Sequence, residues 1–301
     1  MTKAKATERI RLRDGTVSTI GDALDAGVLV LKKTDKMYSS RTASGMRTAY
    51  FAEYPDSGEG WEISAGLYKS RTGEAVVPEE KPIDAAVARG FVAATVQYAN
   101  ASFGSCSTIS GRAKGIFNAA STSSAIAKLC ARGKADCSKG IVTGGLSQGS
   151  IISVLAKNYD SRVQASMGQG TGSTYTVAYN LESCMANGKH AQPGERIRII
   201  NGERDMFVGG SEAIARSQAE LVTGLKCTGR QSCFRSNGSG WYIVKDLEVA
   251  DLNADHCFMG NLGAPGVQCS GILGVDPYYE YGNNQWGVKA TMDWLKTFVR
   301  P

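Results

Sequence analysis

Residues 140–157 of the chain read GIVTGGLSQGSIISVLAK, and this stretch decides the fold. Residues 140–144 form a short apolar run that predicts a β-strand, and the residues from Ser150 onward suit a helix. Between them stands Ser147, with one glycine two residues before it and another two residues after it. A strand, a tight turn carrying a serine and a helix make up a nucleophile elbow, in which the serine backbone is strained and a Cβ at either glycine would crowd the neighbouring backbone. We therefore expect the Ser147 hydroxyl to stand clear of a sheet, within reach of a base and a substrate.

Glycine is abundant, at 36 of 301 residues, so a flexible Gly/Ser loop is the alternative interpretation of the same pentapeptide. An elbow also requires an acid and then a histidine downstream, each after a strand. The chain has two histidines. His190 lies in a polar, turn-rich stretch and is interpreted as a structural residue of a surface loop. His256 follows the strand-like residues 241–244 and precedes a final helix, which favours it as the general base; a loop histidine satisfied by its neighbours is the alternative.

The acid is expected between the serine and the histidine. Residues 196–200 are β-branched and alternating, which predicts a strand, and Asp205 comes a few residues after its end. Three other carboxylates are rivals: Glu203, Asp251 and Asp255. The first is expected to be a solvated loop charge, and the other two are so close to the histidine in sequence that their side chains usually point elsewhere. Ser147, Asp205 and His256 thus follow one another in the required order, with room for a strand and a helix or insertion between successive members.

The length of 301 residues suits one α/β domain with insertions or two small domains, and the composition is that of a globular protein. An apolar fraction of 42% and a charged fraction of 21% are ordinary for such a chain, and no stretch approaches the ~20 apolar residues of a membrane span. The N-terminal residues have no apolar core and do not form a signal peptide. The net charge of +6 is dispersed rather than clustered, which argues against a nucleic-acid partner.

The eight cysteines predict disulfides and an oxidising compartment, so we expect a secreted or periplasmic protein. None of them forms a C-x-x-C pair, which argues against a zinc site, and eight reduced, buried cysteines are the alternative. Spacing does not fix the connectivity. If closures are local, the expected pairs are Cys227–Cys233, Cys257–Cys269, Cys130–Cys137 and Cys106–Cys184.

The order of the expected elements predicts an α/β fold with a mostly parallel central sheet and helices on both faces, because strands alternate with helices over most of the chain. One domain is expected over residues 1–301, with an irregular N-terminal extension over 1–45 and an insertion over the active site at 169–194. Strands are expected at 28–31, 47–54, 61–68, 91–98, 163–168, 196–200 and 241–244. Helices are expected at 82–90, 119–129, 211–225 and 288–299. The apolar run at 91–98 suits the centre of a parallel sheet.

This arrangement resembles the α/β-hydrolase superfamily over roughly residues 45–300. The resemblance is carried by residues 88–92 entering a strand, by the elbow, by residues 201–205 and by the late His256. The elbow, with a glutamine after its serine, is similar to that of cutinases and acetylxylan esterases. Many esterases of the superfamily have a His-Gly-Gly run that supplies part of the oxyanion hole, and this sequence has none. We assign one oxyanion donor to the Gln148 backbone, from the elbow itself, and the second to Tyr68.

The resemblance implies a serine esterase that forms an acyl-enzyme through Ser147, His256 and Asp205, with no metal and no organic cofactor. Its expected partner is a small-molecule or polymeric ester. A peptidase or amidase of the same fold and a non-catalytic binding protein are the alternatives. Aromatic side chains that could line an ester pocket, or simply pack in the core, lie at residues 278–281 and at Trp286, Tyr175 and Tyr179.

Overall fold

The computed structural model describes residues 89–97, 104–132, 135–175, 179–256, 258 and 276–300, and short pieces before them at 9–11, 17–19, 41–42, 45–46, 48–52, 68–69, 75–76 and 85–86. The chain divides into two compact units, Met1–Tyr38 and Ser39–Pro301. In the first, β1 (Arg9–Arg11) pairs antiparallel with β2 (Val17–Thr19). The second unit contains the remaining described elements.

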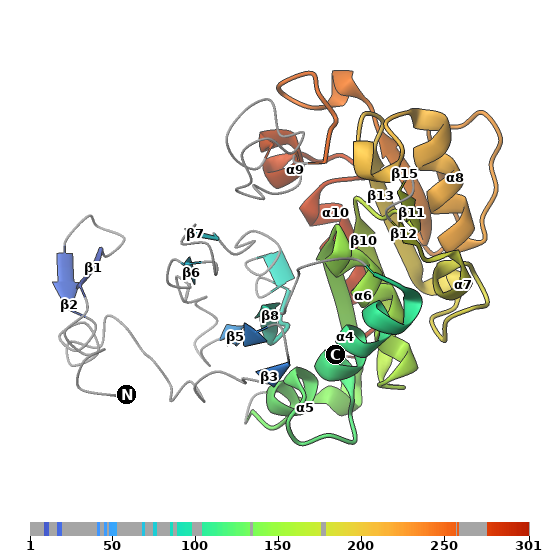
Figure 1. The fold of residues 1–301 in the computed structure, drawn as a ribbon. Helices are drawn as coiled ribbons and strands as arrows, with labels where there is room; N and C mark the ends of the chain where they lie inside the picture. The colour runs from blue at the N-terminus through green and yellow to red at the C-terminus, as the bar shows by residue number, and fades with distance from the viewer. Residues whose placement is uncertain are drawn as a thin grey trace. The chain divides into compact units, whose positions relative to one another are not determined.

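A five-stranded sheet forms the centre of the second unit (Figure 1). Its strands, in spatial order, are β14 (Ser232–Phe234), β15 (Gly240–Val244), β13 (Ile197–Gly202), β10 (Val163–Gln169) and β9 (Ile141–Leu146). The last four are parallel, and β14 pairs antiparallel with β15 at one edge. The predicted α/β class with a mostly parallel sheet is therefore confirmed.

Alternation along β10 explains why helices cover both faces of this sheet. Ala165 and Met167 point into an apolar cluster with Trp294 and Leu295 of α10 (Val288–Lys296). Between them, the Ser166 hydroxyl donates to the Ser153 carbonyl of α6 (Gln148–Leu155) at 3.0 Å, on the opposite face. Successive side chains of a strand point to opposite faces, so α6 and α10 lie on opposite sides of the sheet. The predicted helix at 211–225 is α8 (Glu212–Thr223), which packs on β13 and β15.

Three disulfides confirm three of the predicted pairs. Cys106–Cys184 joins α4 (Cys106–Phe117) to α7 (Glu182–Met185), and Cys130–Cys137 joins α5 (Ala125–Cys130) to the 3₁₀ turn η1 (Cys137–Lys139). Cys227–Cys233 closes a short loop before β14. The predicted pair Cys257–Cys269 lies outside the described residues. Disulfides of this number are typical of an extracellular or otherwise oxidising compartment.

The expected strand at 91–98 forms, but not where it was predicted. It is β8 (Ala93–Gln97), which pairs antiparallel with β5 (Thr48–Ala52), the strand expected at 47–54; no pairing with the five-stranded sheet occurs in the part of the chain that the structure describes. An apolar run indicates burial on both sides of a strand, but it carries no information on which strand lies alongside or in which direction. The prediction of a central parallel strand was therefore wrong.

The remaining described elements are short. Two further antiparallel pairs precede β8: β3 (Arg41–Thr42) with β4 (Gly45–Met46), and β6 (Tyr68–Lys69) with β7 (Ala75–Val76). The expected insertion at 169–194 contains β11 (Thr174–Tyr175), β12 (Tyr179–Asn180) and α7. The other elements are η2 (Ala156–Asn158), η3 (Gly194–Arg196), η4 (Met206–Val208), η5 (Asp246–Glu248) and α9 (Pro277–Tyr281). Residues 85–86 of the expected helix at 82–90 are helical, and the expected strand at 28–31 lies outside the described residues.

Candidate active site

Ser147 occupies the turn between β9 and α6, as the pentapeptide predicts. Its backbone has φ 56° and ψ −124°, a left-handed conformation that L-residues seldom adopt and that costs on the order of 1–3 kcal/mol. A Cβ on Gly145 would lie 2.3 Å from the Gly149 carbonyl carbon, which explains why this flanking position is a glycine. Ser147 is half-buried, so its hydroxyl is not sealed inside the core.

Asp205 follows the carboxyl end of β13 and begins η4. One carboxylate oxygen accepts the Phe207 backbone N–H at 2.9 Å, and the Asp205 carbonyl accepts the Gly210 N–H at 2.8 Å. The side chain is completely buried. Both the side chain and the backbone of Asp205 are therefore held in a fixed orientation by the turn.

His256 meets the second oxygen of this carboxylate. The distance from His256 Nδ1 to Asp205 Oδ2 is 2.6 Å, and the exposed fraction of His256 is only 1%. A carboxylate can only accept hydrogen bonds, so the Nδ1 atom carries the proton and the Nε2 atom of the neutral ring keeps its lone pair. The pair is thus oriented in the tautomer that a general base needs.

The end of β10 connects this pair to the elbow. The Ser147 N–H donates to the Gln169 carbonyl at 2.8 Å, and the next residue, Gly170, donates its N–H to the Ile200 carbonyl at 2.9 Å. A Cβ on Gly170 would lie 2.7 Å from His256 Cε1 and 3.1 Å from Asp205 Oδ2. Two consecutive residues therefore contact the serine on one side and the Asp–His pair on the other.

The rival carboxylates are occupied elsewhere. Glu203 accepts the Asp246 N–H at 2.7 Å and pairs with the Lys245 ammonium at 3.2 Å. Asp251 accepts the Asn253 N–H at 3.1 Å. Asp255 accepts the side-chain amide of the same asparagine at 3.2 Å.

His190 does not lie on the surface as expected. Its exposed fraction is 9%, and burial lowers the pKa of its imidazole. Its polar loop is held against the domain by backbone hydrogen bonds, from Asn187 N–H to the Leu221 carbonyl at 2.8 Å and from Ala191 N–H to Asn158 Oδ1 at 2.6 Å. A polar composition predicts a turn, but it does not show which side of the turn faces the core.

Gln148, the expected first oxyanion donor, is fixed by an arginine that the sequence analysis did not single out. Gln148 is the first residue of α6 and is 1% exposed. Its side-chain oxygen accepts a hydrogen bond from Arg112 Nη1 at 2.9 Å, and Arg112, on α4, is itself buried. Tyr68, the expected second donor, lies in β6 opposite Val76, and its role at the oxyanion stays a prediction.

Aromatic rings lie beside the His256 ring of the Asp–His pair. The Phe207 ring lies 4.7 Å from the His256 ring and 5.4 Å from that of Tyr175, which in turn lies 6.1 Å from Tyr179. Burial, and then the nearby Asp205 charge, raise the pKa of the Tyr179 hydroxyl.

The other expected aromatic group divides into buried and exposed members. Tyr279 and Trp286 are stacked at 6.3 Å inside the core, which confirms packing as their role, and the Tyr279 hydroxyl accepts from Gln169 at 2.5 Å. Tyr278 and Tyr281 are exposed.

The chain matches no protein-family model, no curated protein and no solved structure. Within the described ranges, no group of three or more His, Cys, Asp or Glu side chains could hold a metal ion. None of the helices that the structure describes is both long enough and apolar enough to cross a bilayer.

Proposed function

We propose that this protein is a serine hydrolase that cleaves carboxylic esters through Ser147, His256 and Asp205. The observation that carries the proposal is the buried 2.6 Å hydrogen bond between His256 and Asp205, joined through residues 169–170 to a serine in a left-handed turn. Each part alone has a structural explanation. A strained serine, an oriented imidazole and a buried carboxylate at the same sheet edge are together the parts of a serine–histidine–acid triad.

In this mechanism the Ser147 hydroxyl attacks the ester carbonyl while His256 Nε2 takes its proton. The proton then passes to the leaving alcohol, and an acyl-enzyme remains on Ser147. Water attacks the acyl group in the same way and releases the acid. Asp205 keeps the ring in the reactive tautomer and stabilises it while it is charged.

The oxyanion is bound by the Gln148 N–H, at the amino end of α6, with Tyr68 proposed as the second donor. Losing one such donor typically costs about 3 kcal/mol of the activation barrier, so the position of Gln148 matters for the rate. No step of the scheme requires a metal or an organic cofactor.

We further propose secretion or a periplasmic location, and an ester partner rather than nucleic acid. The three disulfides support the compartment. The dispersed charge of +6 supports the absence of a nucleic-acid footprint.

The test is hydrolysis of p-nitrophenyl acetate and butyrate by the wild type and by Ser147→Ala. We expect kcat to fall about 10⁴-fold or more, because removal of the nucleophile disables the triad as a unit. Ser161→Ala is the matched control, since Ser161 is an exposed turn residue before β10. Unchanged turnover in Ser147→Ala would refute the proposal, and faster cleavage of a peptide p-nitroanilide than of either ester would make the protein a peptidase.

A further inference from the structure

A cavity of 830 Å³ lies at the amino edge of the sheet. Three of its lining residues, Gly140, Arg162 and Arg196, directly precede β9, β10 and β13. Ser147 and Asp205 follow the carboxyl ends of β9 and β13. Because these strands are parallel, the cavity and the candidate active site lie at opposite edges of one sheet.

Among the described residues that line this cavity, none is acidic and four are cationic: Lys139, Arg162, Arg196 and Arg300. Arg162 is neutralised by Asp160, with hydrogen bonds of 3.0 and 2.7 Å. Among the described residues, the other three cations form no ion pair within 4 Å.

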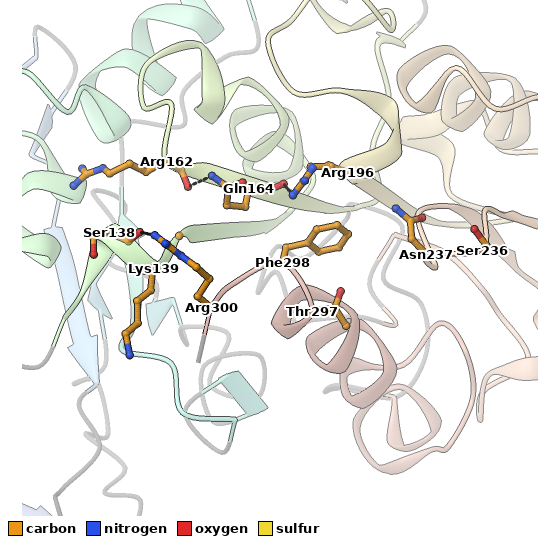
Figure 2. A pocket seen from close by; sticks show the side chains of 11 residues that line it. Ser138, Lys139, Arg162, Gln164, Arg196, Ser236, Asn237, Thr297, Phe298 and Arg300 are labelled. Atoms are coloured by element: carbon orange, nitrogen blue, oxygen red, sulfur yellow. Dashed lines mark hydrogen bonds between the residues drawn. The ribbon is translucent and has the colours of Figure 1, made fainter.

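Neutral groups hold the two arginines. Arg196 donates to the Gln164 carbonyl at 3.4 Å, and its guanidinium lies 5.1 Å from the Phe298 ring centre. Arg300 donates to the Ser138 carbonyl. Figure 2 shows Arg196 extending towards Gln164 and Arg300 towards Ser138, with Phe298 between them. Both guanidinium groups therefore donate to uncharged backbone carbonyls rather than to a carboxylate.

Charges of both signs surround the cavity. Burial lowers the pKa of the nearby Lys157 ammonium most, the charge of Arg196 lowers it further, and the charge of Asp160 raises it. Asp136 is an acidic group next to this edge: its hydrogen bond from Ser138 lowers its pKa most, and the charges of Lys139 and Arg300 lower it further. Asp136, Asp160 and Glu195 lie near the lining but are not part of it, so the lining itself carries a net positive charge that these carboxylates partly offset.

We propose that this cavity binds an acidic polysaccharide, with Arg196, Arg300 and Lys139 pairing with carboxylates on successive sugars. Charges contributed by three separate segments suit a ligand with spaced anionic groups better than a single small anion. The Phe298 ring and the hydroxyls of Ser236 and Thr297 offer the stacking and polar contacts that a sugar ring uses. Acidic polysaccharides also occur in the extracellular space that the disulfides indicate.

The experiment measures calorimetric binding of a galacturonic acid tetramer, which contains no ester, so its outcome is independent of the proposed hydrolase activity. We expect wild-type binding that weakens steeply from about 50 to about 300 mM salt, since exposed charges are screened over this range. The double variant Arg196→Gln/Arg300→Gln is expected to bind about tenfold or more weakly, each lost pair costing a few-fold. Arg230→Gln, an exposed arginine outside the cavity, makes the same change and should bind like the wild type.

Lys139→Gln keeps the test decisive if the double variant fails to fold, because this lysine is exposed and its replacement disturbs no core contact. It should weaken binding about threefold. Four results would each overturn the proposal. A neutral glucose tetramer could bind as tightly as the galacturonic acid tetramer, or all variants could bind the acidic tetramer with equal affinity. Single-stranded DNA could bind more tightly than the acidic tetramer, or inorganic phosphate could bind while the acidic tetramer does not.

Discussion

The two edges of the parallel sheet differ in how their polar groups are held. At the carboxyl edge, Asp205 and His256 are almost fully buried, and the aspartate accepts two hydrogen bonds of defined geometry. At the amino edge, Lys139 and Arg300 are exposed, and the hydrogen-bond partners of Arg196 and Arg300 are backbone carbonyls. The same strands β9, β10 and β13 supply both edges.

This difference separates two kinds of site. Catalysis requires groups fixed to within a fraction of an ångström, which burial and paired hydrogen bonds provide. Binding of a charged polymer requires accessible charge, and tolerates side-chain freedom. A change at the carboxyl edge should therefore alter the rate of hydrolysis, and a change at the amino edge should alter anion binding.

The largest expected effect follows from removing the base. His256→Gln should lower kcat for p-nitrophenyl butyrate by about 10⁴-fold, because a buried amide cannot take the serine proton. His190→Gln is the control, since this second histidine is also buried but contacts a different loop, and it should retain turnover. Galacturonate binding should be unaffected in both. Comparable activity loss in the two variants would point to general destabilisation instead.

One disulfide lies near each edge of the sheet, and the two should contribute differently to the free energy of unfolding. Cys106–Cys184 spans 78 residues and ties down α4, whose Arg112 holds Gln148; Cys130–Cys137 spans 7 and borders the cavity at η1. In urea unfolding, the paired Cys→Ser variants should lose about 4.5 and about 2.4 kcal/mol respectively, from the loop each bridge closes. Only the first should also slow hydrolysis. A larger loss from the shorter bridge would contradict this assignment.

Gly170 tests the close packing at the carboxyl edge. Its φ is +57°, and a Cβ there would contact His256 at 2.7 Å, so Gly170→Ala should displace the imidazole and lower kcat about 10²-fold. Gly188→Ala is the matched control, because Gly188 also has positive φ, +83°, but nothing lies within 4 Å of its Cβ position. Both variants should unfold more readily by about 1 kcal/mol. If Gly170→Ala and Gly188→Ala had equal kcat values, the His256 ring would have room to move away from the added methyl group.

The smallest expected effect concerns the Arg112–Gln148 hydrogen bond. Arg112→Met should lower kcat about tenfold with little change in KM, because the Gln148 backbone acts only on the developing oxyanion. Because the Arg112 guanidinium donates to the Gln148 side chain, Gln148→Met in the Arg112→Met background should add less than it does in the wild type. Arg89→Met, which breaks a bond to Asp293 on α10, should reduce stability alone. If the effects of Arg112→Met and Gln148→Met on kcat were additive, Arg112 would not act through Gln148.

Local patterns in the sequence were enough to predict most of the sheet and the elbow. The strands β9, β13 and β15 each contain two or three β-branched residues, and the spacing of glycines around Ser147 encodes its turn. The order of Asp205 and His256 along the chain pointed to a hydrogen bond that the structure contains. Local spacing likewise predicted the two short-range disulfides.

What could not be predicted depends on tertiary contacts. Helix α4 contains glycine, serine and threonine, which are poor helix formers, and a capping box at Ser105 together with the buried Ile109 and Ile116 stabilises it. Gly170 is required only because His256, distant in sequence, packs on it. Arginine side chains are seldom buried, so Arg112 would be expected on the surface. The neighbouring sequence gave no sign that it contacts Gln148.

The most direct measurement is the site of covalent labelling by a fluorophosphonate, read by intact mass and peptide mapping. We expect one adduct per chain, on Ser147, formed at a rate that falls at least about 10³-fold in His256→Gln, since the probe reacts only with an activated serine. Lack of any adduct, an adduct on another serine, or an unchanged labelling rate without the histidine would contradict it.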